Sequence, residues 1–177
     1  MNKTVEWFLR WDQMIFWMFH DKIKCEVFDR FFPLITHLGS TLSISFCTLV
    51  IVVIDFEPGG DLSKNLGVQT AIALAISHGC IYIIKKAVGR PRPYEKLAFI
   101  HPFPITLRDY SFPSGHTAAA VTVSISFCAL FPQVPFFFLG FSGLVALSRI
   151  YLGVHYPTDV MAGILVGSLC GFAVIGI

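Results

Sequence analysis

Charged side chains are scarce in this sequence. Asp, Glu, Lys and Arg make up 14% of its 177 residues, whereas hydrophobic residues make up 55%, and the mean hydropathy is +0.70. A soluble domain usually has about 25% charged residues, so this chain has too few to cover a surface that faces water. The apolar composition also excludes intrinsic disorder, which needs low hydrophobicity and high net charge. The chain is therefore expected to be an integral membrane protein.

Two further absences narrow the class of protein. The net charge is only +2, which is too small to indicate a nucleic-acid partner. The sequence has five cysteines, an odd number, and four of them lie in apolar runs. This pattern argues against a small secreted module held together by disulfides.

Stretches without Asp, Glu, Lys or Arg mark the expected membrane spans. Four such stretches cover residues 38–54, 65–84, 117–148 and 160–177. A helix needs about 20 residues to cross the hydrocarbon core, and Pro132 and Pro135 divide the longest stretch into two helices joined by a tight turn. The sequence therefore predicts an all-α membrane bundle of five to six helices in a single domain, 1–177. Its spans are expected at about 36–55, 65–86, 115–131, 135–152 and 157–177.

Residues 1–30 show a different pattern. Arg10, Asp12 and Gln13 lie away from a set of large apolar residues that recur at spacings of three and four. These are Trp7, Trp11, Met14, Ile15, Met18 and Phe19. The pattern predicts an amphipathic helix that lies in the membrane interface. The alternative is a sixth span, which would place Arg10 and Asp12 inside the bilayer, where charged side chains are costly.

Polar residues gather at the ends of several expected spans. Because consecutive spans cross in opposite directions, the second span ends at the boundary where the third begins, and the fourth ends where the fifth begins. Side chains from four helix ends should therefore meet at one membrane boundary. They are Lys85, Arg92, Ser114, His116, Arg149, His155 and Asp159.

This set of side chains suits a dianionic phosphate group. Arginine offers planar, forked donors to phosphate oxygens, and a helix that begins at Gly115 would add backbone N–H groups. Asp159 lies four residues after His155, so it would share a helical face with the imidazole. The carboxylate can accept one ring N–H and leave the other nitrogen of His155 free to attack. His116 is then the candidate general acid.

We expect the chemistry to proceed without a metal or cofactor. Phosphoryl transfer depends mainly on positioning and on stabilisation of negative charge, and three fixed cations are available at the expected site. The sequence has no cluster of Asp and Glu suited to holding Mg²⁺ there.

Three blocks of sequence carry a family resemblance. They are Lys85-x6-Arg92-Pro93, Pro113-Ser114-Gly115-His116 and Ser148-Arg149-x5-His155-x3-Asp159. Together, across residues 85–159 and with no departure at the named positions, they resemble the signature blocks of the type 2 phosphatidic acid phosphatase (PAP2) superfamily. The resemblance implies that His155 is the nucleophile, His116 the acid and Asp159 the partner of His155. It also implies that phosphate is held by Lys85, Arg92, Ser114, Gly115 and Arg149.

The favoured function is hydrolysis of a lipid phosphate or pyrophosphate that is presented from the bilayer, through a phosphohistidine. Phosphatidylglycerophosphate, phosphatidic acid and undecaprenyl pyrophosphate are candidate substrates that the sequence does not separate, and no obligatory protein partner is expected. One alternative is a membrane transporter, which would need ionisable residues within its spans. Another is a non-catalytic protein that binds phosphate lipids. Lys86 and Arg90 are interpreted as basic residues that end a span, and not as site residues.

Two arguments disagree about which side of the cell membrane carries the site. Basic residues concentrate in 1–30 and 85–108, on the expected site face, whereas the opposite face has little beyond Lys64. The positive-inside rule would therefore place the site in the cytoplasm, whereas the family resemblance implies the extracytoplasmic face. Because phosphate binding explains part of the basic cluster, we expect the extracytoplasmic face.

Overall fold

The computed structural model describes residues 3–97, 107 and 109–176, and in the first helix it describes the side chains of Trp7 and of residues from Arg10 onward. Every regular element in these ranges is helical, which confirms the expected all-α fold. The α-helices are α1 (Lys3–Trp17), α2 (Glu26–Leu38), α3 (Thr41–Ile54), α4 (Leu66–Val88), α5 (Pro93–Lys96), α6 (Gly115–Leu130), α7 (Pro135–Tyr151) and α8 (Pro157–Ile175). A short π-helical segment, η1 (Met18–Lys22), follows α1, and a single 3₁₀ turn, η2 (Leu62–Lys64), precedes α4.

The helices differ in their capacity to cross a membrane. Among the described residues, the segment Leu66–Lys96 and α8 are each long and apolar enough to span, and α2 and α3 form a third candidate if they count as one bent span. Helices α6 and α7 are apolar but shorter, with 16 and 17 residues. At about 1.5 Å per residue, a helix of that length is a little shorter than a typical hydrocarbon core.

A bend of 53° separates α2 from α3. Ser40 caps the start of α3, since its hydroxyl accepts a hydrogen bond from the backbone N–H of Ser43. The range expected as a span at about 36–55 therefore begins in the last turn of α2 and continues through the bend into α3. The bend lies in an uncharged stretch, so the spacing of charged residues could not predict it.

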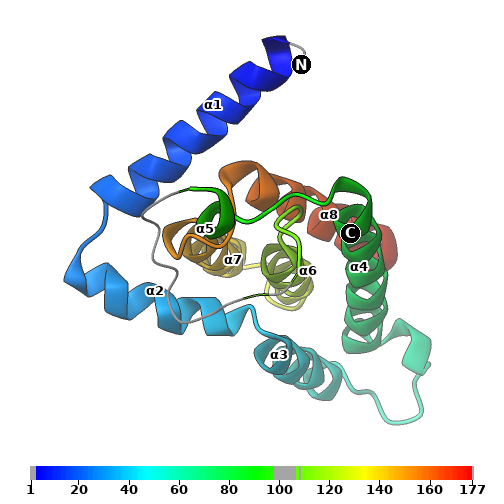
Figure 1. Cartoon of the computed structure of the whole chain (residues 1–177). Helices are drawn as coiled ribbons and strands as arrows, with labels where there is room; N and C mark the ends of the chain where they lie inside the picture. Colours follow the sequence, from blue (N-terminus) through cyan, green and yellow to red (C-terminus); the bar gives the residue numbers. More distant parts are fainter. Residues whose placement is uncertain (1–2, 98–106, 108, 177) are drawn as a thin grey trace.

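The centre of the bundle is the contact between α6 and α8, beside α4 and α7 (Figure 1). Gly163, Gly167 and Gly171 recur every fourth residue along α8 and face α6. A Cβ atom at Gly167 would lie 2.4 Å from the carbonyl oxygen of Ala118, so only glycine permits this approach. The close contact also allows the Thr122 hydroxyl to donate to the Gly167 carbonyl at 3.1 Å. Small residues that let helix backbones approach are the usual basis of helix association in membranes.

Helix α1 reaches away from the bundle toward the N-terminus (Figure 1). Its C-terminal part packs on the bundle, where Phe16 is fully buried in a cluster with Tyr156, Ala146 and Ile150. Trp11 and Met14 are exposed on the same helix. The helix therefore presents one side to the protein and another to its surroundings.

Substitution of Gly167 by alanine should force α6 and α8 apart. The added Cβ would overlap the backbone of Ala118, and overpacking of this kind typically costs about 1–3 kcal/mol. We therefore expect a lower midpoint for thermal unfolding of the detergent-solubilised protein. Gly143→Ala in α7 is the matched control, because a Cβ there meets nothing within 4 Å and alanine favours the helix. An unchanged midpoint for Gly167→Ala would contradict the close contact between the two helices.

Candidate active site

A cavity of about 570 Å³ lies at one end of the bundle. Its walls come from α4, from the first turn of α6, from the end of α7 and from the loop before α8. Gly39 and Thr41 at the α2–α3 bend also line it, as do Leu107, Asp109 and Tyr110. Six residues expected at the site line it: Lys85, Arg92, Gly115, His116, Arg149 and His155. Ser114 and Asp159 do not line the cavity and are completely buried. The alternation of helix direction thus brings the expected residues to the same end.

The two arginines at the cavity are almost fully buried but are held differently. Arg92 is 1% exposed, and its guanidinium donates to the carbonyl of Val154 at 2.8 Å and to the carboxylate of Asp109 at 2.5 Å. Arg149 is also 1% exposed, and its Nη1 donates to the Thr36 hydroxyl at 2.7 Å. The Nε and Nη2 atoms of Arg149 are buried and have no hydrogen-bond partner among the described residues. A buried cation with open donors is costly unless an anion joins it, so this position favours an anionic ligand.

Asp109 pairs with two of the cations, although the sequence did not single it out. Its carboxylate lies 2.8 Å from Lys85 Nζ and 2.5 Å from Arg92 Nη2. Partial burial alone would raise the pKa of this carboxyl, but the hydrogen bonds and charges of Lys85 and Arg92 lower the pKa to about 2. Asp109 therefore stays ionised at neutral pH. One signal was present in the sequence, because Asp109 is the only acidic residue between Glu95 and Asp159.

The loop between α7 and α8 positions His155 in the interior. Its backbone N–H donates to the carbonyl of Arg149 at 3.2 Å, and its ring is 1% exposed. Nε2 lies 3.3 Å from Arg92 Nη1, which is a donor, so Nε2 is the acceptor nitrogen and Nδ1 carries the proton. Burial, followed by the positive charges of Arg149 and Arg92, lowers the pKa of His155 well below its ordinary value. The imidazole is therefore neutral at neutral pH.

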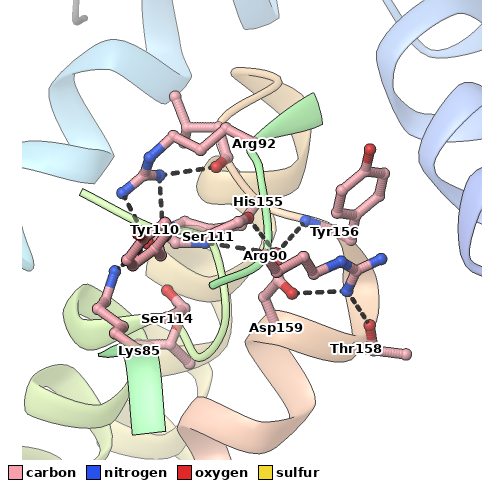
Figure 2. A network of polar contacts seen from close by, with 12 residues as sticks. Lys85, Arg90, Arg92, Tyr110, Ser111, Ser114, His155, Tyr156, Thr158 and Asp159 are labelled. Atoms are coloured by element: carbon pink, nitrogen blue, oxygen red, sulfur yellow. Dashed lines mark hydrogen bonds and ion pairs between the residues drawn. The ribbon is translucent and has the colours of Figure 1, made fainter. Parts of the chain in front are cut away.

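Asp159 lies behind His155 and accepts hydrogen bonds from several directions (Figure 2). Its Oδ2 is 3.6 Å from His155 Nδ1, which is slightly longer than a hydrogen bond. The same oxygen accepts from the hydroxyl of Ser111, which is itself 3.5 Å from His155 Nδ1, and from the backbone N–H of Tyr156 at 2.8 Å. Ser111 therefore lies beside both members of the histidine–carboxylate pair. It precedes the second sequence block and was not among the expected site residues.

The interpretation of Arg90 as a basic residue that ends a span is wrong. Its Nη1 donates to Asp159 Oδ1 at 2.7 Å, and its side chain is 17% exposed. The cause is Gly89, which has the left-handed conformation with φ +61°. This residue ends α4 and turns the chain, so Arg90 points back into the protein instead of continuing toward the membrane surface.

The first turn of α6 supplies the remaining expected residues. Gly115 begins the helix, which places its N-terminal, positive end at the cavity wall. His116 lines the cavity on the same turn. The hydroxyl of Ser114 accepts a hydrogen bond from Thr117, and its backbone N–H donates to the carbonyl of Asp159 at 2.9 Å. Ser114 thus joins the start of α6 to the start of α8.

Comparison with known proteins shows the family and the fold. The family model described as PAP2 superfamily matches residues 66–177. Over 90 residues the chain is 34% identical to a lipid A 1-phosphatase of Rhizobium etli, which covers 48% of this chain and 38% of that protein. Over 115 residues it is 31% identical to an undecaprenyl-diphosphatase of Sulfolobus acidocaldarius, which covers 62% of this chain and 54% of that protein. The matched regions thus span only about two fifths to a half of these curated relatives.

Solved structures with the same fold cover almost the whole chain. The structure of LpxE from Aquifex aeolicus has a TM-score of 0.81 and 24% identity, and covers 93% of this chain and 94% of that one. A transmembrane PAP2-type phosphatidylglycerolphosphate phosphatase from Bacillus subtilis has a TM-score of 0.79 and 25% identity, and covers 99% and 86%. The apolar helices and these similarities identify a membrane protein with the PAP2 phosphatase fold.

Asp109→Asn should strengthen the binding of inorganic phosphate. An anion must compete with the Asp109 carboxylate for Lys85 and Arg92, and asparagine keeps the shape but removes the charge. We expect the Kd for phosphate to fall about 3- to 10-fold, the effect of relieving roughly 1 kcal/mol of repulsion. Calorimetric titration of the detergent-solubilised protein measures this, with Glu57→Gln on the exposed turn before α4 as the control. Weaker binding by Asp109→Asn would show that the carboxylate serves to position the cations instead.

Proposed function

The chain belongs to the PAP2 superfamily, and we propose that it is a membrane phosphatase that hydrolyses a lipid phosphate or pyrophosphate through a phosphohistidine intermediate. The observation that carries this proposal is the buried guanidinium of Arg149, whose Nε and Nη2 have no partner among the described residues. This group lies on the same cavity as Arg92 and the neutral imidazole of His155. A phosphate bound there would satisfy the open donors and lie beside a nucleophilic nitrogen.

In the first step, Nε2 of His155 attacks phosphorus and forms an N–P bond. The bond between phosphorus and the leaving oxygen breaks. His116, which takes up a proton from solvent when the bound phosphate offsets the positive charges of Arg149 and Arg92, gives that proton to the leaving oxygen. The Nδ1 proton of His155 stays on the ring, where Asp159 at 3.6 Å stabilises the positive charge that develops. The dephosphorylated lipid then leaves.

In the second step, water attacks the phosphorus of the phosphohistidine. His116, now neutral, accepts a proton from the water as the P–N bond breaks, and inorganic phosphate is released. Throughout, Lys85, Arg92 and Arg149 offset the charge on the phosphoryl oxygens, together with the N-terminal end of α6 at Ser114 and Gly115. Because these groups supply the charge stabilisation, we propose that no metal or cofactor is required.

The substrate would reach the cavity from the bilayer. Ile81, Tyr82 and Leu107 line the cavity beside the cations, so apolar surface adjoins the phosphate site. Phosphatidylglycerophosphate, phosphatidic acid and undecaprenyl pyrophosphate remain the candidate substrates. The named relatives act on different lipids, which agrees with a shared phosphate site and variable surroundings.

His155→Ala should abolish phosphate release from every lipid tested while the protein still inserts and folds. The substitution removes the attacking nitrogen, and loss of a nucleophile typically costs several orders of magnitude in turnover. Phosphate release is measured with each candidate lipid in mixed detergent micelles that contain EDTA. A phosphohistidine trapped by acid quench in the wild type, and absent from His155→Ala, would identify the nucleophile.

His37→Ala is the matched control, because His37 is exposed on α2 and does not line the cavity. It should retain wild-type turnover. Activity near wild type in His155→Ala would refute the assignment. Phosphate binding without turnover in the wild-type protein would instead favour the non-catalytic alternative.

We further propose that the chain is one membrane-embedded domain of the cell membrane, with the site on the extracytoplasmic face and α1 in the interface on that side. In this orientation the turn at 55–64 faces the cytoplasm and Leu97 faces outward. This orientation is supported by the family resemblance alone. The distribution of basic residues favours the opposite orientation.

The orientation predicts which single cysteines are reached from outside the cell. In a background without the five native cysteines, Leu97→Cys should react with a membrane-impermeant thiol reagent in intact cells or spheroplasts. Lys64→Cys, at the other end of α4, should react only after the membrane is permeabilised. The reverse pattern would place the site in the cytoplasm and exclude a role in recycling lipids released on the outside.

A further inference from the structure

Helix α1 and the segment η1 that continues it share a narrow buried side, and the α1 part of this side contacts the start of α8. Asp12, Phe16 and His20 follow one another at intervals of four residues and are 3%, 0% and 8% exposed. Trp11, which precedes Asp12, and Met14, which lies between Asp12 and Phe16, are 44% and 55% exposed. A carboxylate on the buried side of a surface helix is unusual, because burial of an unpaired charge is costly. Its partners therefore indicate what it does.

Asp12 is paired at both of its oxygens. Oδ1 accepts from the backbone N–H of Thr158 at 2.9 Å, in the first turn of α8. Oδ2 accepts from the hydroxyl of Thr158 at 2.7 Å and from Arg90 Nη2 at 2.5 Å. Asp12 thus fixes both the start of α8 and the guanidinium of Arg90.

Arg90 connects Asp12 to the buried carboxylate of the candidate site. Its Nη2 donates to Asp12. Its Nη1 donates to Asp159 Oδ1 and to the Thr158 hydroxyl, each at 2.7 Å (Figure 2). The guanidinium also lies 3.9 Å from the centre of the Tyr156 ring. Because the guanidinium is a rigid plane, its position on one carboxylate determines its position on the other.

The two carboxylate oxygens of Asp159 connect Arg90 to His155. Oδ1 accepts from Arg90, whereas Oδ2 accepts from Ser111 and lies 3.6 Å from His155 Nδ1. The contacts therefore form a continuous series from α1 to the imidazole, through Asp12, Arg90 and Asp159. Neither Asp12 nor Arg90 is among the residues expected to bind phosphate.

We propose that Asp12 is a positioning residue for the histidine–carboxylate pair. Through Arg90 it holds Asp159 in the orientation that aligns His155, so turnover depends on the docking of α1 against the start of α8. This inference rests on the proposed phosphatase function. Since the opposite side of α1 exposes Trp11 and Met14, the same contact would link insertion of α1 into lipid to alignment of the nucleophile.

Asp12→Asn tests the proposal, because it keeps the size of the side chain and removes its charge. We expect kcat to fall about 10- to 100-fold, the usual effect of a small misplacement of reacting groups. KM should change less than about 2-fold, because Lys85, Arg92 and Arg149 do not contact Asp12 and uniform binding is retained. Asp21→Asn, an exposed carboxylate in η1, should match the wild type.

Phe16→Ala separates positioning from simple attachment of α1. Phe16 packs α1 on the bundle through apolar contacts with Ala146, Ile150, Tyr156 and Val160, so its loss should lower the unfolding midpoint more than Asp12→Asn does. Phe16→Ala should lower kcat less than Asp12→Asn does. If Asp12 only attaches the helix, the two variants would show the opposite ranking or equal effects on kcat, and the proposal would be overturned.

A double-mutant comparison tests whether Asp12 acts through Arg90. Arg90→Gln alone should lower kcat, and Asp12→Asn should add less than about 2-fold in that background, since residues that act in series are non-additive. Multiplicative effects would contradict the series.

A readout that needs no turnover keeps this test distinct from that of the phosphatase function. The ring ¹⁵N resonances of His155 in labelled protein should shift in Asp12→Asn and stay unchanged in Asp21→Asn. If the wild type releases no phosphate from any lipid but the resonances shift, the phosphatase assignment fails and the positioning role stands. Unchanged resonances would overturn the positioning role whatever the activity.

Discussion

The buried, incompletely paired guanidinium of Arg149 is the constraint on which the rest of the site depends. Removing a cation from water costs several kcal/mol unless other groups compensate. Within the part of the chain that the structure describes, only Nη1 of this guanidinium has a hydrogen-bond partner, Thr36. The other cations cannot relieve this cost, and Arg92 adds repulsion. The surrounding helices must therefore hold Arg149 in place. Under the proposed function, the binding of a phosphate would relieve this penalty.

The glycine contacts between α6 and α8 provide the rigidity that such a site requires. Gly163 and Gly167 bring the two helix backbones together, and the bond from Ser114 N–H to the Asp159 carbonyl joins their first turns. His116 and Asp159 therefore occupy fixed positions on adjacent helix starts. Because these positions come from backbone packing, they do not depend on flexible side chains. Asp12 and Arg90 extend this control to the orientation of Asp159 from α1.

Much of the site could be predicted from the sequence because its residues lie at the ends of apolar stretches. The alternation of helix direction was enough to bring Lys85, Arg92, His116, Arg149 and His155 to one end of the bundle, where all five line one cavity. The pairing of these residues could not be predicted in the same way. Asp109 and Ser111 belong to a segment without helical periodicity, and the direction of Arg90 depends on the left-handed turn at Gly89. The bend between α2 and α3 was hidden for a related reason, since it lies in an uncharged stretch.

The sequence by itself determined that the chain is a membrane-embedded, all-α protein with a phosphate-type set of residues at its helix ends. The lengths of apolar stretches, the gaps between charged residues and the spacing of nearby residues are local properties. They can therefore be read from the sequence without knowledge of the fold. Only the tertiary structure decided which groups hold the histidine–carboxylate pair. Asp12 contacts Arg90 across 78 positions and Thr158 across 146, and Arg149 contacts Thr36 across 113. Contacts over such separations leave no periodic pattern in one sequence, because they arise from the packing of helices whose faces the local spacing does not specify.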